Sequence, residues 1–362
     1  MAATKPLRVG YIGAGWADRV QIPIFAMAGL QPQAIAAGHV ENARRVAQNH
    51  GIPEVYAAWQ ELVDAPTVDV VSIVTPPHLH REISEAALAA GKHVICEKPT
   101  ALNAAEAEAM LAAAQRFPGQ MAILDHELRF HPRRVQMRRL IKEGYVGSVL
   151  TVHLDWLYPH RLNADAPWTW QHDAQQGGGI LGALGSHLLD QARWMIGRID
   201  ALTARLKVGH FFRTDPATGT ERQVTADDHA DLLLQFNNGV HGTLRVSALS
   251  PGGSGMSITV VGTAGALWLD ARDRLWGRQG GGLLEGDWTP VEPDSPMVDV
   301  ATLPISTSFA VGTYHMAQVL AQELSAGNVD IADAASFYDG LVVQRGLDAA
   351  RRSHDEQIWV QL

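Results

Sequence analysis

The chain has 362 residues, of which 46% are hydrophobic and 19% are charged, and its net charge is −9. These values are typical of a globular protein long enough for two domains, and the acidic balance disfavours a nucleic acid or an anionic membrane as partner. The single cysteine, Cys96, excludes an intrachain disulfide and favours the cytoplasm, and no apolar run reaches the roughly 20 residues of a membrane span.

Short apolar runs alternate with helical segments along the first third of the chain. Five of these runs predict strands, at residues 7–13, 34–38, 68–75, 93–96 and 121–125. Helices are predicted between them, with Gly51 and Gly91 as stop signals and Asn103 as an N-cap. Continuous apolar strands separated by helices indicate a parallel sheet that is covered on both faces.

The pattern changes after about residue 150. Alternating runs rich in β-formers cover residues 148–157, 201–212, 228–249 and 257–270, and Asn237–Gly239 is a strong hairpin signal. These runs predict a mainly antiparallel sheet, and residues 332–353 predict a final amphipathic helix. We therefore expect an α/β protein with a first domain at 1–125 and a second at 126–362, whose last helices pack back on the first domain.

A glycine-rich turn follows the first predicted strand and opens a helix. Gly13 and Gly15 fill the first two positions of the G-x-G-x-x-G pattern, where they allow a tight turn and a close approach to a pyrophosphate. The third position is Asp18, which we expect to face solvent or to cap a neighbouring group. The turn predicts a dinucleotide site formed by Gly13, Ala14, Gly15, Trp16 and Ala17.

The end of the second strand normally carries an acid that binds the ribose 2′-hydroxyl of NAD. Here Gly38 and His39 stand at that place, and His39, Arg44 or Arg45 offers a partner for a 2′-phosphate. This favours NADP over NAD, although the two arginines also suit a solvated helix face.

Two strand ends carry polar residues followed by prolines. Thr75, Pro76, Pro77 and His80 follow the third strand, and Glu97, Lys98 and Pro99 follow the fourth. Since ligands of parallel sheets bind at the carboxyl ends of the strands, we expect Lys98 to lie at the cofactor crevice.

The segments VGYIGAG, VSIVTPPHLH, AAGKHVICEKPTALN, GYVGSVLTV, GGGILGALGSHLLDQARWMIG and VVGTAGALWLD together resemble the Gfo/Idh/MocA oxidoreductase family. The resemblance implies an N-terminal Rossmann domain and a C-terminal α/β domain with a large open antiparallel sheet. Through that sheet, members form homodimers or homotetramers. It also implies NAD(P)-dependent redox chemistry on a sugar, a polyol or a related ring compound.

The resemblance also implies residue roles. Lys98 matches the catalytic lysine, which stabilises charge on the reacting oxygen, and His187 matches the general acid/base. Thr75, Pro76 and His80 match residues of the cofactor cleft, and Glu97 precedes the lysine beside the nicotinamide ribose.

One position departs from the family pattern. The aspartate that often stands four residues before the histidine is Ala183 here, and Asp190 matches a position that usually supports the fold. Substitute polar groups are offered by Asp125, His126, Glu127 and Arg129. Trp168 and Trp170 are candidates for stacking on a sugar ring, with core packing as the alternative for one of them, and His160 or Arg161 is a further candidate.

Other chemistries find less support. Clusters such as His78 with His80, or His126, Glu127 and His131, lack the spacing of a metal site, so no metal is expected. Cys96 ends an apolar strand and is interpreted as a buried structural thiol. There is no nucleophile elbow or other hydrolase signature.

Three functional hypotheses follow. The first is an oxidoreductase acting on a sugar, a sugar derivative or a cyclic polyol. The second is an enzyme that retains its cofactor and catalyses glycoside cleavage or epimerisation without net redox change. The third is a cofactor-sensing or sugar-sensing binding protein without turnover, which the loss at Ala183 keeps open.

Overall fold

The computed structural model describes residues 6–280 and 287–362. The sequence favours a loop in the glycine-rich segment GRQGGGLLEG, at 277–286, of which residues 281–286 lie outside the described residues. The chain divides into two compact units, one of residues 1–132 and 296–341, the other of residues 133–295 and 342–362. Residues 126–132 and 296–341 therefore belong to the first unit. The domain boundary expected from the sequence, at residue 125, places them in the second domain. The long helix α9, Phe337–Glu356, begins in the first unit and continues in the second.

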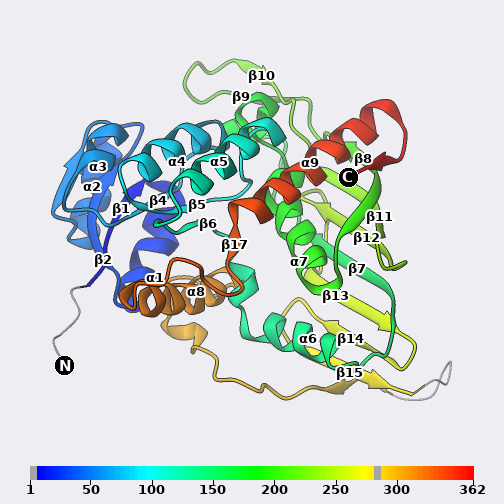
Figure 1. Cartoon of the computed structure of the whole chain (residues 1–362). Coiled ribbons are helices and arrows are strands. Elements are labelled where there is room, and N and C mark those ends of the chain that lie inside the picture. The colour runs from blue at the N-terminus through cyan, green and yellow to red at the C-terminus, as the bar shows by residue number, and fades with distance from the viewer. Residues whose placement is uncertain (1–5, 281–286) are drawn as a thin grey trace. The chain divides into compact units, whose positions relative to one another are not determined.

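The first unit is built on a seven-stranded sheet (Figure 1). Its order is β3-β2-β1-β4-β5-β6-β17, and all pairs are parallel except that of β17 with β6. The strands are β1 Arg8–Ile12, β2 Gln31–Ala36, β3 Glu54–Tyr56, β4 Val70–Ile73, β5 His93–Cys96, β6 Ala122–Leu124 and β17 Ala335–Ser336. This is the strand order of the Rossmann fold, in which two mononucleotide-binding halves meet between β1 and β4.

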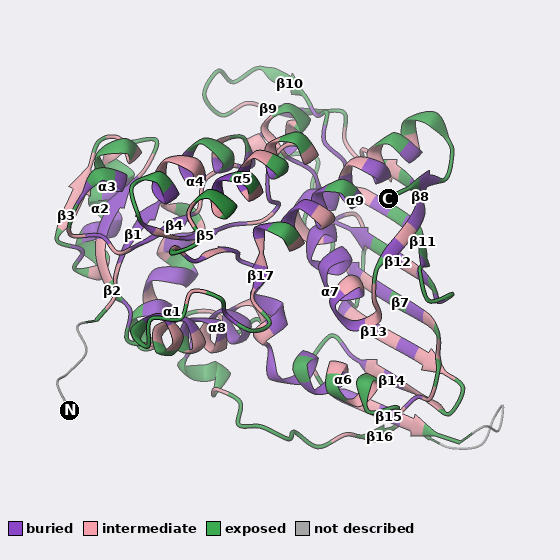
Figure 2. Cartoon of the chain, viewed as in Figure 1, coloured by how far each residue is buried: buried purple, intermediate pink, exposed green. Residues whose placement is uncertain are grey.

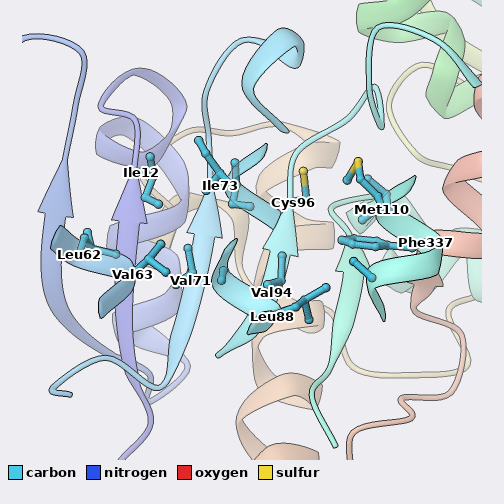
Figure 3. Packing of buried hydrophobic residues seen from close by; sticks show 14 of the residues in the cluster. Ile12, Leu62, Val63, Val71, Ile73, Leu88, Val94, Cys96, Met110 and Phe337 are labelled. Carbon is cyan, nitrogen blue, oxygen red and sulfur yellow. The ribbon is translucent and has the colours of Figure 1, made fainter. Parts of the chain in front are cut away.

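Alternate residues of these strands enter two different cores. Ile12, Ile73 and Val94 belong to the cluster on one face of the sheet, and Tyr11, Val70 and Ile95 of the same strands belong to the cluster on the other. Helices α3 Trp59–Asp64, α4 His80–Ala89 and α5 Ala104–Arg116 cover the first face (Figure 3), and α1 Ile22–Met27, α2 Val40–His50 and α8 Ser308–Ser325 cover the second. Because both faces are covered, the strands read as continuous apolar runs in the sequence.

Two local signals are confirmed. Asn103 Oδ1 accepts a hydrogen bond from the Glu106 backbone N–H at 3.0 Å and caps α5. Gly51 ends α2 with φ of +66°, a conformation that favours glycine. Cys96 is buried in the first core, where burial raises the pKa of its thiol and makes it an inert structural residue.

The second unit is built on a nine-stranded sheet of order β16-β15-β14-β13-β7-β12-β11-β8-β18. All pairs are antiparallel except that of β7 with β12. The strands are β7 Val149–Leu157, β8 Ile199–Lys207, β11 His229–Phe236, β12 His241–Ser247, β13 Gly255–Gly262, β14 Gly265–Leu269, β15 Leu275–Gln279, β16 Thr289–Pro290 and β18 Val360–Gln361. The predicted hairpin at Asn237–Gly239 is confirmed as the turn between β11 and β12.

One face of this second sheet is buried and the other is open. Residues of β11 alternate between buried and exposed along the strand (Figure 2). Helix α7, Ser186–Ile196, packs on β7, and α9 is bonded to β8 through Ser353, whose Oγ accepts from the Ala204 backbone N–H at 2.8 Å. A further helix, α6 Pro132–Lys142, precedes β7, and a two-stranded hairpin is formed by β9 Phe212–Thr214 and β10 Glu221–Gln223.

Candidate active site

The glycine turn after β1 has the geometry that a dinucleotide requires. Gly13 has φ of +116°, and a Cβ there would lie 2.3 Å from the Val74 carbonyl oxygen at the end of β4. A Cβ at Gly15 would meet no atom within 4 Å, so space is open beside this backbone. The residues present therefore fit a pyrophosphate at this turn, where the helical segment that includes Trp16 and Ala17 begins.

The side chains near the end of β2 are engaged with one another. Arg45 Nη1 lies 2.9 Å from Asp18 Oδ2, and His50 Nε2 lies 2.8 Å from the other oxygen of Asp18. Burial by itself raises the pKa of Asp18, but the bonds from His50 and Arg45 outweigh it and lower the pKa overall. Asp18 thus caps neighbouring groups, as expected. Arg44 pairs with Glu41, and Gly38 and His39 are exposed.

The loops after β4 and β5 are fastened together by His80. Its Nε2 lies 2.9 Å from the Thr75 carbonyl oxygen, and its Nδ1 lies 3.0 Å from that of Pro99. Burial lowers the pKa of His80 to about 4, against the raising effect of these carbonyls. His80 is therefore a buried brace between the two loops, and it fixes the backbone directly after Lys98.

Lys98 follows the end of β5 and is partly exposed, between the buried residues Glu97 and Pro99. Thr75 and Pro76 follow the end of β4, the neighbouring strand in the sheet, and Pro77 is buried. The Oγ1 atom of Thr75 is buried and has no hydrogen-bond partner in the part of the chain that the structure describes. An unpaired hydroxyl at the carboxyl edge of the sheet is a fitting contact for a bound nucleotide.

Three charged candidates lie in the segment after β6. Asp125, Glu127 and Arg129 are each less than 5% exposed, and Arg129 Nη2 lies 3.4 Å from Asp339 Oδ1. Burial, with the nearby charges of Asp125 and Glu97, raises the pKa of Glu127 well above its ordinary value. The carboxyl groups that follow β5 and β6 therefore form a buried acidic group at the carboxyl edge of the first sheet.

In the second unit, the glycine run Gly177–Gly179 before α7 is a loop in which backbone and side chains approach closely. A Cβ at Gly178 would lie 2.5 Å from the Gln171 carbonyl oxygen, and one at Gly179 would lie 2.4 Å from Asp227 Oδ1. Asp227 Oδ2 accepts from the Leu181 backbone N–H at 2.7 Å, at the start of the following π-helical turn Leu181–Gly185. Such turns are frequent at functional sites.

His187 lies in the first turn of α7, directly after the π-helical turn. It is 1% exposed, and its ring centroid lies 5.9 Å from that of Trp156 on β7. Gln191 stands one helical turn later and is also 1% exposed, and neither its amide nitrogen nor its amide oxygen has a partner among the described residues. Ala183, His187 and Gln191 share one side of the helical segment by their spacing of four.

The two candidate tryptophans have different surroundings. Trp168 is 8% exposed, donates its indole N–H to the Gln223 carbonyl at 3.2 Å, and carries the Arg222 guanidinium 3.5 Å from its ring centroid. It is packed on the β9–β10 hairpin. Trp170 is half-buried and begins a short 3-10 turn, so it is the better candidate for a ligand contact.

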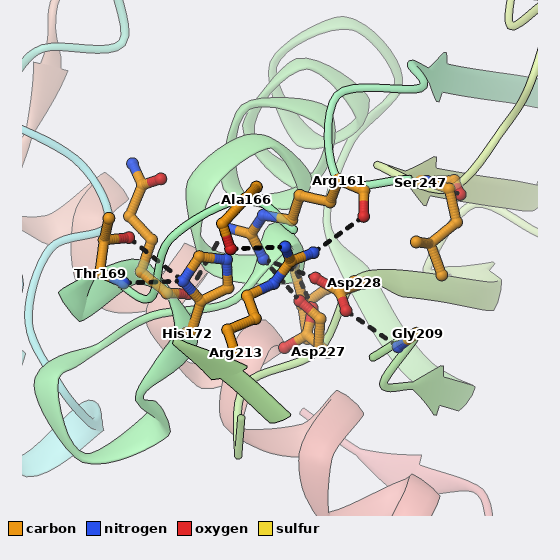
Figure 4. Close-up of polar contacts among 12 residues, drawn as sticks. Arg161, Ala166, Thr169, His172, Gly209, Arg213, Asp227, Asp228 and Ser247 are labelled. Atoms are coloured by element: carbon orange, nitrogen blue, oxygen red, sulfur yellow. Dashed lines mark hydrogen bonds and ion pairs between the residues drawn. The ribbon is translucent and has the colours of Figure 1, made fainter. Parts of the chain in front are cut away.

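Arg161 and Arg213 hold the loop that carries these tryptophans (Figure 4). Arg161 Nη1 lies 2.9 Å from Asp228 Oδ1, and Arg213 donates to the carbonyls of Asn163, Ala166 and Arg161. Both guanidinium groups are buried and engaged, so their contacts are structural.

Two further properties concern the described residues as a whole. Within 6–280 and 287–362, no three His, Cys, Asp or Glu side chains are grouped so that they could hold a metal ion. In the same ranges, the helices are too short or too polar to cross a membrane.

The strand order, the glycine turn and the ligand edge of the first unit define a Rossmann domain with a dinucleotide site. Comparisons with known proteins agree. The pattern of the oxidoreductase family with an NAD-binding Rossmann fold matches residues 7–123, and that of the GFO/IDH/MocA C-terminal domain matches residues 135–268. The chain belongs to the Gfo/Idh/MocA family of oxidoreductases.

Relatives match nearly the full chain. An uncharacterised oxidoreductase of Synechocystis is 30% identical over 99% of this chain and 97% of its own length. The human glucose-fructose oxidoreductase domain-containing protein 2 is 30% identical over 97% of this chain and 92% of its own length. Among solved structures, a levoglucosan dehydrogenase in complex with NADH and L-sorbose is 25% identical, covers 98% of both chains and has a TM-score of 0.88.

Sequence reasoning did not single out Gln21, Ser72, Asp228 or Gln191. Gln21 is a polar residue in the apolar segment VQIPIF, and that isolation is a signal of a buried amide with specific partners. Its partners are distant in sequence, so no local pattern reveals them.

Proposed function

We propose that the protein transfers hydride between a nicotinamide cofactor and a hydroxyl or carbonyl carbon of a sugar, a sugar derivative or a cyclic polyol. The observation that carries the proposal is the position of Lys98 at the carboxyl edge of β5, in a Rossmann sheet whose glycine turn is open at Gly15. The similarity to a levoglucosan dehydrogenase with NADH and L-sorbose supports this substrate class.

The residue roles follow from chemistry and from the family resemblance. A bound nicotinamide supplies or accepts the hydride. The Lys98 ammonium binds the reacting oxygen of the substrate and stabilises the negative charge that develops on it. His187 exchanges a proton with the same hydroxyl group, and its buried position limits competition from water. Thr75 lines the cleft that takes the nicotinamide ribose, and Glu97 stands beside that ribose.

Gln191 is proposed as the polar group that compensates for Ala183. It lies on the same side of the helical segment as His187, and its unpaired amide can both donate and accept a hydrogen bond. An amide cannot take up a proton as a carboxylate does. Gln191 would therefore replace the family's aspartate in binding the substrate, and the proton transfer would be left to His187.

The contacts of the arginines favour NAD as the cofactor, in contrast to the preference for NADP suggested by the sequence. Arg45 is held by Asp18, and Arg44 is held by Glu41. A 2′-phosphate would have to displace a carboxylate from Arg45 and would then lie close to the charge of Asp18.

A homodimer or homotetramer is proposed through the open face of the second sheet. The face has a shallow hollow lined by polar side chains of four strands, among them His153, Asp155, Arg205, Asp231 and Arg245. Leu233 is 50% exposed beside them. Light scattering coupled to size exclusion tests the proposal, and a monomer at micromolar concentration would contradict it.

The activity test uses a panel of sugars and cyclic polyols with NAD and NADP, and it follows nicotinamide absorbance and product together. A free-cofactor dehydrogenase changes both. Product without net absorbance change indicates a retained cofactor, and binding without product indicates a sensor. Lys98→Met and His187→Asn should each lower turnover by at least about 100-fold while the Kd of the cofactor stays within a few-fold. Retention of most activity by His187→Asn would contradict its assignment.

A further inference from the structure

Gln21 is a completely buried amide that connects three strand ends of the first sheet. Its Nε2 donates to Glu97 Oε1 at 3.0 Å and to Asp125 Oδ2 at 2.7 Å, after β5 and β6. Ser72 of β4 donates its hydroxyl to Gln21 Oε1 at 2.6 Å. Since the amide oxygen is already occupied by a donor, the two N–H groups of Gln21 must face the carboxyl groups.

Both carboxyl groups lie within hydrogen-bond distance of the same Gln21 nitrogen, so they are close neighbours inside the protein. Two like charges that share a buried site repel each other, so ionisation of one carboxyl disfavours ionisation of the other. Burial, followed by the charge of Asp125, raises the pKa of Glu97 well above its ordinary value. Burial also raises the pKa of Asp125. The bonds donated by Gln21 and the charge of Lys98 favour one ionised carboxyl in the pair, and the mutual repulsion disfavours a second.

Other titratable groups lie around the pair. Lys98, on the loop after β5, favours the charged form of both carboxyls. Burial of Glu127, on the turn after β6, raises its pKa well above the ordinary value, and the charges of Asp125 and Glu97 raise it further. The Cys96 thiol is neutral. The charge of the pair is therefore opposed by Lys98 alone among these neighbours.

The fold places this charge on a particular half of the sheet. In the Rossmann fold, the half formed by β1, β2 and β3 takes the adenosine and the half formed by β4, β5 and β6 takes the nicotinamide nucleoside. Glu97 and Asp125 follow β5 and β6. The nicotinamide ring carries a positive charge when oxidised and none when reduced, so a fixed negative charge on this half acts on one form only.

We propose that Gln21 is a positioning residue that holds Glu97 and Asp125 as a singly charged pair, and that this charge favours oxidised over reduced cofactor in binding. The inference rests on the proposed function. In a partly buried site, the interaction between two unit charges is strong enough to change an affinity ratio on the order of tenfold.

The experiment measures the Kd of oxidised and of reduced cofactor by calorimetry and fluorescence, without substrate. The double variant Glu97→Gln/Asp125→Asn removes both ionisable groups and keeps their shapes. Each single variant leaves one carboxyl that can carry the charge. We expect the double variant to lose about tenfold in the affinity ratio of oxidised to reduced cofactor, and each single variant to keep most of it.

Gln21→Met is the second variant, because it fills the same space without the amide. Gln21→Met should also lower the affinity for oxidised relative to reduced cofactor. It provides the test if the double variant fails to fold. An unchanged ratio in the double variant, or in Gln21→Met when only that variant folds, would overturn the inference. Absence of any cofactor binding by the native protein would instead refute the proposed function.

Discussion

The buried ion pair between Arg161 and Asp228 allows a quantitative prediction about the second unit. The side chains are 6% and 1% exposed, and their charged atoms lie 2.9 Å apart. Arg161→Met keeps the apolar stem of the side chain and removes the guanidinium. Asp228 then remains buried with the Gly209 backbone N–H, at 2.9 Å, as a donor. Breaking a buried pair from one side costs about 3–5 kcal/mol, since a charge is left without its counter-ion.

This loss of unfolding free energy should produce a clear fall in the melting temperature of the second unit. In domains of 150–250 residues, each kcal/mol shifts the Tm by about 2–4 °C, so the variant should melt on the order of 10 °C lower by calorimetry. Arg161→Met/Asp228→Asn should recover much of the loss, because the double change removes the unpaired charge. The matched control is Arg198→Met, which breaks an exposed pair with Asp200 at 2.8 Å in the same unit. It should lower the stability by less than about 1 kcal/mol.

Two results would refute the reasoning. One is a Tm of Arg161→Met that lies within about 2 °C of the native value. The other is equal destabilisation by Arg161→Met and Arg198→Met, which would mean that burial does not increase the cost of a broken pair.

Two predictions concern carboxylates of the first unit. Asp18→Ala releases Arg45 and should improve the affinity for NADP relative to NAD about fivefold to tenfold in calorimetric titrations, whereas an unchanged ratio would exclude Asp18 as a determinant. Glu97→Gln should stabilise the protein increasingly as the pH rises from 5 to 8. The raised pKa means that the folded state keeps a proton that the unfolded state has lost, so native stability falls above the ordinary pKa of 4.5. A Tm difference independent of pH would contradict that linkage.

The parallel sheet was predictable because its strands are buried on both faces. The expected strand at 93–96 matches β5, His93–Cys96, and the expected runs at 7–13 and 68–75 contain β1 and β4. The strand β3, Glu54–Tyr56, was missed. It has three residues, two of them polar or amphipathic, and it is only half-buried, so it lacks the apolar run that marks its neighbours.

Residues of the candidate site could be predicted from the sequence only where polar side chains directly follow the end of a predicted strand. The residues after β4, β5 and β6 were selected by that rule, which applies to any parallel sheet. The bond of Gln21 to Asp125 spans 104 positions, and that of Arg161 to Asp228 spans 67. Local periodicity carries no information on such pairs, and the fold alone brings them together.

Asp18 and Gln21 lie three residues apart in the first helical segment after the glycine turn, and their side-chain partners lie on opposite halves of the first sheet. Asp18 engages Arg45 beside β2, on the adenosine half, and Gln21 engages Glu97 and Asp125 on the nicotinamide half. The two effects should therefore separate. Asp18→Ala should change the ratio of NAD to NADP affinity and leave the ratio of oxidised to reduced cofactor unaltered. Gln21→Met should do the reverse. If both variants moved both ratios, displacement of the whole helical segment would explain them better than two local charges.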